Sequence, residues 1–220
     1  MIKLVVFDWN GTLLADAQAC WETDNHVLKY FGGKQVSLKT YRDTIIIPSI
    51  GFYEMHGCNR KQLEMEFKKL GEVFHTYYEP RVSKARTRIN TRKILNYLLK
   101  NKIESIILSN HTVTGINSQL KRLKIEKYFS RMLANDALSL SMERRNKKEK
   151  LEDFLKNNKF KKDEIMIVGD SPEEVEIGKY CGIKTVAITG GYYATHRLVA
   201  SHPDYLINNL DELRVIISAC

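Results

Sequence analysis

Residues 2–12 read IKLVVFDWNGT, an apolar run that ends at the acid Asp8 and is followed by a turn containing Gly11. A nearly continuous apolar and β-branched run is typical of a strand that is covered on both faces of a parallel sheet. Asp8 then lies at the carboxyl end of this strand, where open parallel sheets bind their ligands. The stretch therefore predicts a core strand and a carboxylate placed for chemistry, although an isolated Asp in such a position more often caps the next segment.

Similar short apolar runs recur beyond residue 100 and alternate with longer stretches of helical periodicity. The further predicted strands are 105–108, 131–133, 165–168, 185–188 and an edge strand at 205–207. The predicted helices are 91–99, 113–123, 148–157, 172–181 and 211–217, and Gly182 is the predicted C-cap of the fourth. Strands that alternate with helices in this way predict an α/β fold with a parallel, Rossmann-like sheet.

Residues 15–85 depart from this alternation, because they are rich in helical patterns and contain no convincing central strand. Helices are predicted at 17–31, 38–44 and 60–78, separated by Gly32-Gly33 and by the segment 48–57. We predict a small α-helical cap domain over 15–85, inserted after the first strand of a core domain formed by 1–14 and 86–220. A cap in this place would close over the carboxyl ends of the strands and restrict substrates to small molecules.

The composition is that of an ordinary globular protein, with 220 residues of which 43% are hydrophobic and 28% charged. The 35 Lys and Arg exceed the 26 Asp and Glu, and the net charge of +9 suits phosphate-bearing partners. Nucleic acid is a disfavoured partner, because no zinc-ligand spacing and no concentrated basic arm accompany the charge. No apolar run reaches the roughly 18 residues of a membrane span, so we expect a cytoplasmic protein with no membrane partner. The four cysteines have no CxxC spacing, which predicts free thiols.

Three further polar segments fall beside the predicted strands. Ser109-Asn110 follows the strand 105–108, the basic run RRNKK covers 144–148, and GDSPEE covers 169–174. Taken singly, these segments read as a turn, a solvated surface and a helix N-cap. Taken together, hydroxyl, amide and carboxylate groups at neighbouring strand ends can hold a phosphate oxygen and a hard cation such as Mg²⁺.

In this order, FDWNGT, IILSN, the Lys147 region and VGDSPEE resemble the four motifs of the haloacid dehalogenase superfamily. The helical insertion is similar to that of its phosphoglycolate phosphatase-like subgroup. The resemblance implies a Mg²⁺-dependent hydrolase that acts on a small phosphorylated metabolite through an aspartyl-phosphate, as a monomer or homodimer. The implied site residues are Asp8 as nucleophile; Thr12, Ser109, Asn110 and Lys147 around the phosphate; Asp8, the carbonyl of Asn10, and Asp170 around the metal; and Glu174 as their support.

The active-site lysine is open among Lys147, Lys148 and Lys150. Lys147 is preferred, because in similar family members an apolar residue follows four positions later and the metal-binding Asp about twenty-three positions later. Leu151 and Asp170 match that spacing.

Position 10 departs from the family pattern, in which a second Asp protonates the leaving oxygen and then activates water. Asn10 donates hydrogen bonds but supplies no proton at neutral pH. One interpretation is a phosphatase that uses a good leaving group or another acid, namely His111, His26, Tyr53 or His56. A second is a slow enzyme or pseudoenzyme whose phosphate pocket serves binding or regulation.

Two further interpretations come from other branches of the same superfamily. A phosphonoacetaldehyde-hydrolase-like activity also occurs with a non-acidic residue at this position, but it needs a cap lysine, for which Lys29, Lys34 and Lys39 are available. A dehalogenase would carry an aromatic residue at position 10.

Two segments are candidates for contact with the substrate. Around 48–57, the residues Tyr41, Arg42, Tyr53 and His56 combine polar aromatic groups with a cation, which suits a small polar phosphoester. Their aromatic neighbours are expected mainly to pack the helices. The segment 190–197 follows the strand 185–188 and is a candidate for contact with the site from the side, or for a surface loop.

Overall fold

The computed structural model describes residues 1–136 and 146–220. Its centre is a six-stranded sheet in which all paired neighbours run parallel, in the order β3-β2-β1-β4-β5-β6. The strands are β1 (Leu4–Phe7), β2 (Glu104–Thr112), β3 (Arg131–Asn135), β4 (Ile165–Gly169), β5 (Lys184–Ile188) and β6 (Tyr205–Ile207). The predicted α/β, Rossmann-like fold is confirmed.

The predicted strand at 105–108 is too short. In the structure β2 continues to Thr112, with a register shift between Leu108 and Thr112 where it pairs with β3. Ser109 and Asn110 therefore lie within the irregular end of a strand, and not in a turn beyond it. Such an irregularity changes the direction of the side chains at the end of the strand.

Successive residues of β1 face opposite sides of the sheet, as the pleat requires. Val5 and Phe7 join an apolar cluster with α6 (Thr91–Lys100), α7 (Val113–Leu123) and α12 (Leu213–Ala219). Leu4 and Val6 join another with α9 (Lys147–Lys156) and α10 (Pro172–Cys181). The sheet is thus covered on both faces, which explains the continuous apolar run at the start of the sequence.

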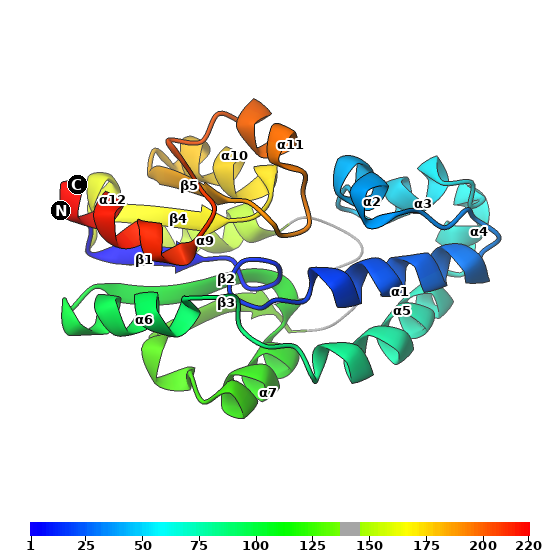
Figure 1. Ribbon diagram of the computed structural model, residues 1–220, viewed down its shortest axis with the longest axis horizontal. Coiled ribbons are helices and arrows are strands. Elements are labelled where there is room, and N and C mark those ends of the chain that lie inside the picture. Colours follow the sequence, from blue (N-terminus) through cyan, green and yellow to red (C-terminus); the bar gives the residue numbers. More distant parts are fainter. Residues whose placement is uncertain (137–145) are drawn as a thin grey trace.

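Five helices between β1 and α6 form the part of the molecule that Figure 1 shows beyond the carboxyl ends of the strands. They are α1 (Ala17–Tyr30), α2 (Leu38–Thr44), α3 (Ile50–Met55), α4 (Arg60–Met65) and α5 (Phe67–Val82). Their apolar cluster includes Leu28, Tyr41 and Leu70, and it continues into the rest of the molecule through Tyr193 and Leu198. The boundaries proposed for a separate cap domain stay a prediction.

Some elements differ from the expectation. The segment 48–57 contains α3, and the helix predicted at 60–78 is two helices, with the break at Glu66. The short helices that had no counterpart in the prediction are η1 (Glu126–Tyr128), η2 (Lys162–Glu164) and α11 (Thr195–Ala200), whereas η3 (Leu210–Glu212) and α12 together cover the helix predicted at 211–217. Gly182 caps α10 with a φ of 68°, as predicted.

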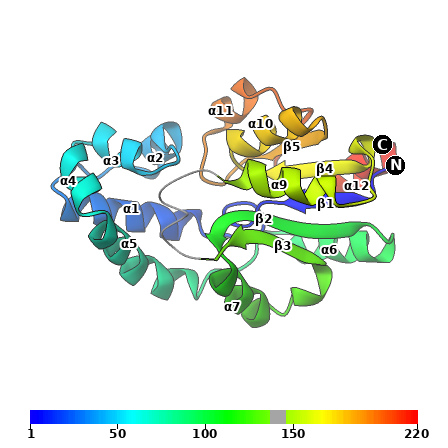
Figure 2. The same cartoon turned by 180° about the vertical axis from the view of Figure 1, so that it is seen from behind.

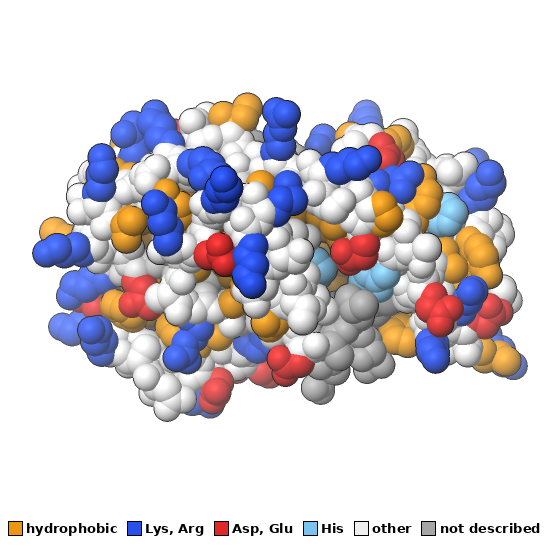
Figure 3. Space-filling view, turned by 90° about the horizontal axis from the view of Figure 1, so that it is seen from below, with side chains coloured by type: hydrophobic (Ala, Val, Ile, Leu, Met, Phe, Trp, Pro, Cys, Tyr) orange, Lys and Arg blue, Asp and Glu red, His pale blue; other side chains and the backbone are white. Residues whose placement is uncertain are grey.

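The state of the cysteines and the distribution of surface charge agree with what the composition predicts. All four cysteines are free thiols, as predicted. Within the described residues, no helix has the length and apolar character needed to cross a membrane. Figure 3 shows Lys and Arg side chains spread over one face with acidic side chains between them. Figure 2, the opposite view to Figure 1, shows α9 and α10 on the side of the sheet away from α6.

Candidate active site

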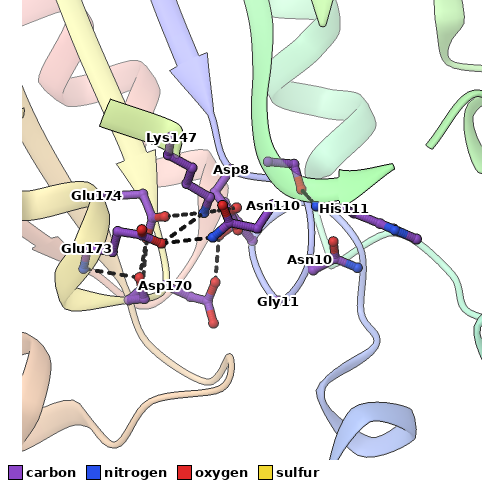
Figure 4. Close-up of polar contacts among 12 residues, drawn as sticks. Asp8, Asn10, Gly11, Asn110, His111, Lys147, Asp170, Glu173 and Glu174 are labelled. Carbon is purple, nitrogen blue, oxygen red and sulfur yellow. Dashed lines mark hydrogen bonds and ion pairs between the residues drawn. The ribbon is translucent and has the colours of Figure 1, made fainter. Parts of the chain in front are cut away.

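Asp8 and Lys147 meet at the carboxyl end of β1. The Nζ of Lys147 donates to Oδ1 of Asp8 at 2.7 Å, and each side chain is only 6% exposed. Asp8 directly follows β1 and Lys147 begins α9, so the topology joins two residues that are 139 positions apart in the chain. Figure 4 shows both side chains pointing into one cluster of polar groups.

The three lysines left open by the sequence have different partners. Lys147 lines the cavity at the end of the sheet, whereas Lys148 and Lys150 do not. Lys148 places its ammonium 3.3 Å from the ring centroid of Tyr180, and Lys150 donates to Oδ1 of Asn135. The geometry therefore selects Lys147. The arginines at 144 and 145, which belong to the same predicted basic run, lie outside the described residues.

Two glutamates of α10 surround Lys147 with further negative charge. Oε1 of Glu174 accepts from Nζ at 2.5 Å, and Oε2 of Glu173 lies 3.7 Å from it. Burial alone would lower the pKa of Lys147, but the charges of Asp8, Glu174 and Glu173 outweigh burial and raise that pKa well above its ordinary value. The lysine is therefore a permanent cation at neutral pH.

Asp170 directly follows β4 and is held by two donors. Its Oδ1 accepts from Oγ1 of Thr12 at 2.9 Å, and its Oδ2 accepts from the main-chain N–H of Tyr192 at 2.6 Å. Burial, followed by the charge of Glu174, raises the pKa of Asp170 from 3.8 to about 6. Thr12 was predicted to bind the phosphate. It is fully buried and does not line the cavity, and its hydroxyl instead orients Asp170.

The turn after Asp8 requires glycine for two reasons. Gly11 has a φ of 77°, in the left-handed region, and a Cβ added to it would lie 2.4 Å from Oδ2 of Asp170. The guanidinium of Arg88 fixes the turn by donating to the carbonyl of Gly11 at 2.8 Å and to that of Thr189 at 2.5 Å. The turn and the end of β5 are thereby joined.

Ser109 and Asn110 line the same cavity from the end of β2. Oγ of Ser109 accepts from the main-chain N–H of His111 at 3.1 Å, and Nδ2 of Asn110 donates to Oε2 of Glu173 at 3.1 Å. The main-chain carbonyl of Asn110 accepts from Nδ2 of Asn135 at 2.7 Å. Ser109 and Asn110, two of the residues predicted around the phosphate, thus lie at the cavity and are oriented by neighbouring groups.

Asn10 also lines the cavity, but Figure 4 shows its side chain apart from the cluster around Asp8. Its Nδ2 donates to Oδ2 of Asp16 at 2.7 Å and to the hydroxyl of Tyr78 at 3.0 Å. The same Oδ2 of Asp16 accepts from the hydroxyls of Tyr78 at 2.6 Å and Tyr192 at 2.7 Å. Because a carboxylate only accepts, the NH₂ of Asn10 must face Asp16, and its carbonyl oxygen is left for the cavity.

Of the four side chains considered as alternative acids, His111 is the one that lines the cavity in the described part of the chain. Burial lowers the pKa of His111, so its imidazole is neutral at neutral pH. The other three have partners elsewhere: His26 stacks on Tyr77 with ring centroids 4.1 Å apart, His56 bonds Thr44 at 3.0 Å, and Tyr53 bonds Asp24 at 2.6 Å.

The wall opposite the sheet comes from the helices that follow β1. The lining residues there include Cys20, Asp24, Tyr41, Ile45, Phe74 and Tyr78. The enclosed space is about 160 Å³, which suits a small ligand. Of the aromatic and basic residues singled out in this region, Tyr41 reaches the cavity, whereas Arg42, Tyr53 and His56 do not.

The segment 190–197 joins the sheet to this wall. Nε of Arg42 donates to the carbonyl of Gly191 at 3.0 Å, and Nη1 of Arg197 donates to the carbonyl of Ile45 at 2.7 Å. Tyr192 and Tyr193 both line the cavity. The predicted contact of this segment with the site from the side is confirmed.

Sequence reasoning missed two buried acids, Asp16 and Asp24. Asp24 carried a usable signal, because it lies on the same helical face as Val27 and Leu28, three and four positions later. An acid on the buried stripe of a helix is rare and points to a specific partner. Asp16 precedes α1 and carried no such signal.

The cluster at the end of the sheet has an excess of negative charge. Its buried carboxylates are Asp8, Asp170, Glu173 and Glu174, and its buried cation is Lys147. Burial, opposed by Lys147 and reinforced by Glu174 and Asp170, raises the pKa of Asp8 well above its ordinary value. A divalent cation would relieve this imbalance, and two carboxylates with a main-chain carbonyl form an oxygen donor set that Mg²⁺ accepts.

Among the residues described, no three His, Cys, Asp or Glu side chains converge as a complete metal cage. Mg²⁺ is commonly bound by one or two carboxylates, with water and substrate oxygens completing its shell. The residues present therefore fit such an ion.

Comparison with known proteins agrees with this geometry. Residues 5–188 match the family model described as haloacid dehalogenase-like hydrolase. The chain is 23% identical to the phosphoglycolate phosphatase of Pseudomonas fluorescens Pf-5 over 99% of its length and 79% of the relative's. It is also 23% identical to the pyrophosphatase PpaX of Bacillus mycoides, over 99% of this chain and 97% of the relative.

Solved structures are similar over the whole chain as well. The crystal structure of a predicted phosphatase from Clostridium acetobutylicum superposes with a TM-score of 0.82 and 17% identity, and the match covers 100% of both chains. This likeness shows the fold. With the family match over residues 5–188, it follows that the chain belongs to the haloacid dehalogenase-like hydrolases, as its four motifs predicted.

Proposed function

We propose that the protein hydrolyses a small phosphomonoester through a phosphorylated Asp8. The observation that carries this proposal is the buried 2.7 Å contact between Nζ of Lys147 and Oδ1 of Asp8, in a cavity at the carboxyl edge of the sheet. A carboxylate is repelled by a phosphate dianion unless cations screen it. The names of the relatives, phosphoglycolate phosphatase and pyrophosphatase, support this class of reaction.

The excess of buried carboxylates supports magnesium as the second cation. The residues that would hold it are Asp8, Asp170 and, through its main-chain carbonyl, Asn10. When bound, the ion supplies positive charge to the phosphate oxygens during transfer. Thr12 and the main-chain N–H of Tyr192 hold the carboxylate of Asp170 in one orientation.

The reaction has two steps, both on the phosphorus atom. A carboxylate oxygen of Asp8 first bonds to phosphorus while the bond from phosphorus to the ester oxygen breaks, and the leaving oxygen takes up a proton from water. Lys147, Ser109 and Asn110 bind the remaining phosphoryl oxygens. A water oxygen then bonds to phosphorus and the bond to Asp8 breaks, which releases inorganic phosphate and restores the carboxylate.

Proton transfer is the step that this chain handles differently, because Asn10 supplies no proton. His111 lines the cavity with a neutral imidazole, which suits it to accept the proton of the attacking water. Expulsion of the leaving group then depends most on that group's own acidity. Among esters that bind equally well, those with more acidic leaving groups, such as aryl phosphates, are therefore expected to react faster.

A slow enzyme whose phosphate pocket serves binding is the second candidate, and the amide at position 10 is the observation that favours it. A phosphonoacetaldehyde-hydrolase-like reaction has less support, because it needs a lysine in the cavity. Lys29, Lys34 and Lys39 are exposed, and none of them lines the cavity.

The test is Mg²⁺-dependent turnover of 4-nitrophenyl phosphate by wild type and by Asp8→Asn, with Asp153→Asn as matched control. Asp153 is an exposed acid of α9 outside the cavity. Turnover that is lost in Asp8→Asn and kept in the control supports the proposal. Turnover that survives in Asp8→Asn overturns the nucleophile, whereas phosphate binding without any turnover favours the second candidate.

A further inference from the structure

The cavity wall formed by α1, α2 and α5 contains no Lys or Arg in the described residues, and His75 of α5, which also lines the cavity, has its Nδ1 3.4 Å from Oε1 of Glu79. Among those residues Lys147 is the one Lys or Arg that lines the cavity, and it belongs to the phosphate end beside Asp8. Arg42, which follows Tyr41 in α2, and Arg197 both donate to main-chain carbonyls and are absent from the lining. An anionic leaving group would therefore meet no described counter-charge here.

The hydroxyl donors of this wall are already used. Tyr41 donates to Oδ2 of Asp24 at 2.8 Å, and Tyr78 and Tyr192 donate to Oδ2 of Asp16 at 2.6 and 2.7 Å. For these three tyrosines of the lining, the structure gives the acceptor of the hydroxyl group. Each turns its donor toward a carboxylate, so the wall offers acceptors and aromatic faces to a ligand.

Asp24 is the charged group of this wall. The residue is 2% exposed, and its carboxylate accepts from three neutral donors: Tyr53 at 2.6 Å, Tyr41 at 2.8 Å and the thiol of Cys20 at 3.7 Å. No Lys, Arg or His within the described ranges forms an ion pair with it. A buried carboxylate without a cation is costly, and a carboxylate keeps acceptor capacity beyond three donors.

A second acceptor faces the same space. The NH₂ of Asn10 is held by Asp16, so the carbonyl oxygen of its amide is the atom left for the cavity. The aromatic rings of Phe74 and Tyr78 also line the cavity, and aromatic faces attract cations. The carboxylate of Asp24, the amide oxygen of Asn10 and the rings of Phe74 and Tyr78 thus favour a positively charged, hydrogen-bond-donating ligand.

We propose that the leaving group of the substrate carries an ammonium group that binds the carboxylate of Asp24, so that the substrate is a short amino-alcohol phosphate. This inference rests on the proposed phosphatase activity and adds the substrate class. It also separates this chain from the substrate named for its relative, because the carboxylate of phosphoglycolate would be placed against Asp24. Burial raises the pKa of Asp24 to about 6, and near neutral pH it is still mostly ionised.

The experiment compares three esters of nearly equal size that differ in the end group: O-phosphoethanolamine, 2-hydroxyethyl phosphate and phosphoglycolate. With wild-type protein and Mg²⁺ near neutral pH, we expect kcat/KM to fall in that order. The ammonium ester should exceed the neutral ester by about tenfold or more, the usual effect of one charge-assisted hydrogen bond. Equal or better turnover of phosphoglycolate overturns the inference.

Two variants test whether the preference for the ammonium ester depends on the side chain of Asp24. Asp24→Asn should lower the ratio of kcat/KM for O-phosphoethanolamine over 2-hydroxyethyl phosphate by about tenfold. Glu22→Gln, which removes a charge from the same helix outside the cavity, should keep the wild-type ratio. An unchanged ratio in Asp24→Asn rejects the role of Asp24, and the wild-type panel stands as a test even if that variant does not fold.

Failure of the two proposals can be told apart. If the neutral ester and 4-nitrophenyl phosphate are both inert, the proposed phosphatase activity fails and the substrate class fails with it. If 4-nitrophenyl phosphate is hydrolysed in an Asp8-dependent manner but the ammonium ester has no advantage, the substrate class alone is wrong.

Discussion

Nδ2 of Asn10 donates to Oδ2 of Asp16 at 2.7 Å, and the amide lies apart from Asp8, the proposed nucleophile (Figure 4). The carboxylate of Asp16 is buried and also receives hydroxyls from Tyr78 and Tyr192. The residue that breaks the family pattern is therefore part of a network that joins the turn after β1 to α5 and to the segment 190–197. A substitution at position 10 acts on that network as well as on the reaction.

Asn10→Asp places a second carboxylate beside that of Asp16, at the 2.7 Å that the hydrogen bond from Asn10 now spans. Repulsion raises the pKa of the new carboxyl, because one proton shared between the two acids replaces the N–H. We expect turnover of an alkyl phosphate to rise about a hundredfold, since the pair of acids then holds a proton that can pass to the leaving oxygen. Asn10→Ala, which provides no acid, is the control and should not gain.

The same variant has an opposite effect on stability. A carboxyl whose pKa is raised on folding binds its proton more tightly in the folded state, so stability falls as pH rises through that pKa. The melting temperature of Asn10→Asp should therefore drop below wild type more at about pH 8 than at about pH 5. A variant equally stable at both values would show that the two acids do not interact.

Lys147→Ala removes the buried cation of the site. Asp8, Glu174 and Glu173 would lose the cation that they share, and such a loss typically costs about 3–5 kcal/mol of folding free energy. In the fraction that folds, kcat/KM for 4-nitrophenyl phosphate should fall about a hundredfold or more. Lys148→Ala, whose ammonium covers the ring of Tyr180, should stay near wild type in both measurements. A larger activity loss in Lys148→Ala would mean that the wrong lysine was chosen.

Much of this site could be predicted because it depends on the ends of strands. Asp8, Ser109 and Asp170 each follow or end an apolar run, and parallel strands bring such ends to one edge of the sheet. Lys147 was preferred by spacing and is the lysine that contacts Asp8, although Lys148 and Lys150 satisfied the same charge pattern.

The helical wall could not be predicted to this depth. Asp24 accepts from Tyr41 and Tyr53, which are 17 and 29 positions away in the chain. Which of these side chains meet depends on how the helices cross. Local pattern also failed at Glu66, where one predicted helix is two, because no Gly or Pro marks the break. Pro80, which would be expected to end a helix, lies inside α5.

Asp24→Asn should change how stability depends on pH. Burial raises the pKa of Asp24 from 3.8 to about 6, so the folded state holds the proton more tightly and wild type loses stability as pH rises between these values. Above that range, ionisation of the buried carboxylate lowers the free energy of unfolding of wild type by about 3 kcal/mol. The variant has no carboxylate at this position and does not lose this stability. Relative to wild type, Asp24→Asn should gain stability from about pH 4 to about pH 8, measured by urea unfolding.

A neighbouring variant checks the cause of this shift. The hydroxyl of Tyr53 donates to Asp24 and lowers its pKa, in opposition to burial. Tyr53→Phe should therefore raise that pKa further and steepen the loss of stability with rising pH. A flatter profile in Tyr53→Phe would contradict the assignment to Asp24.

Magnesium should stabilise the folded protein apart from any turnover. Four buried carboxylates share one buried lysine, and an ion that binds the folded state alone raises the melting temperature by mass action. At saturating MgCl₂ we expect a rise of about 5–10 °C over NaCl of equal ionic strength, reversed by EDTA. Asp170→Asn should abolish most of the rise, whereas an undiminished rise in that variant would place the ion elsewhere.

Gly11→Ala tests the close approach of the turn to Asp170, and the chain offers a matched control in Gly32. Both glycines have nearly the same φ, 77° and 76°, so alanine is strained equally at either position. A Cβ at Gly32 meets no atom within 4 Å, whereas a Cβ at Gly11 would lie 2.4 Å from Oδ2 of Asp170. Gly32→Ala should lose about 1 kcal/mol of stability and keep its activity. Gly11→Ala should lose more stability and, because Asp170 must move, most of its Mg²⁺-dependent turnover. Equal losses in the two variants would show that backbone strain alone explains the glycine at position 11.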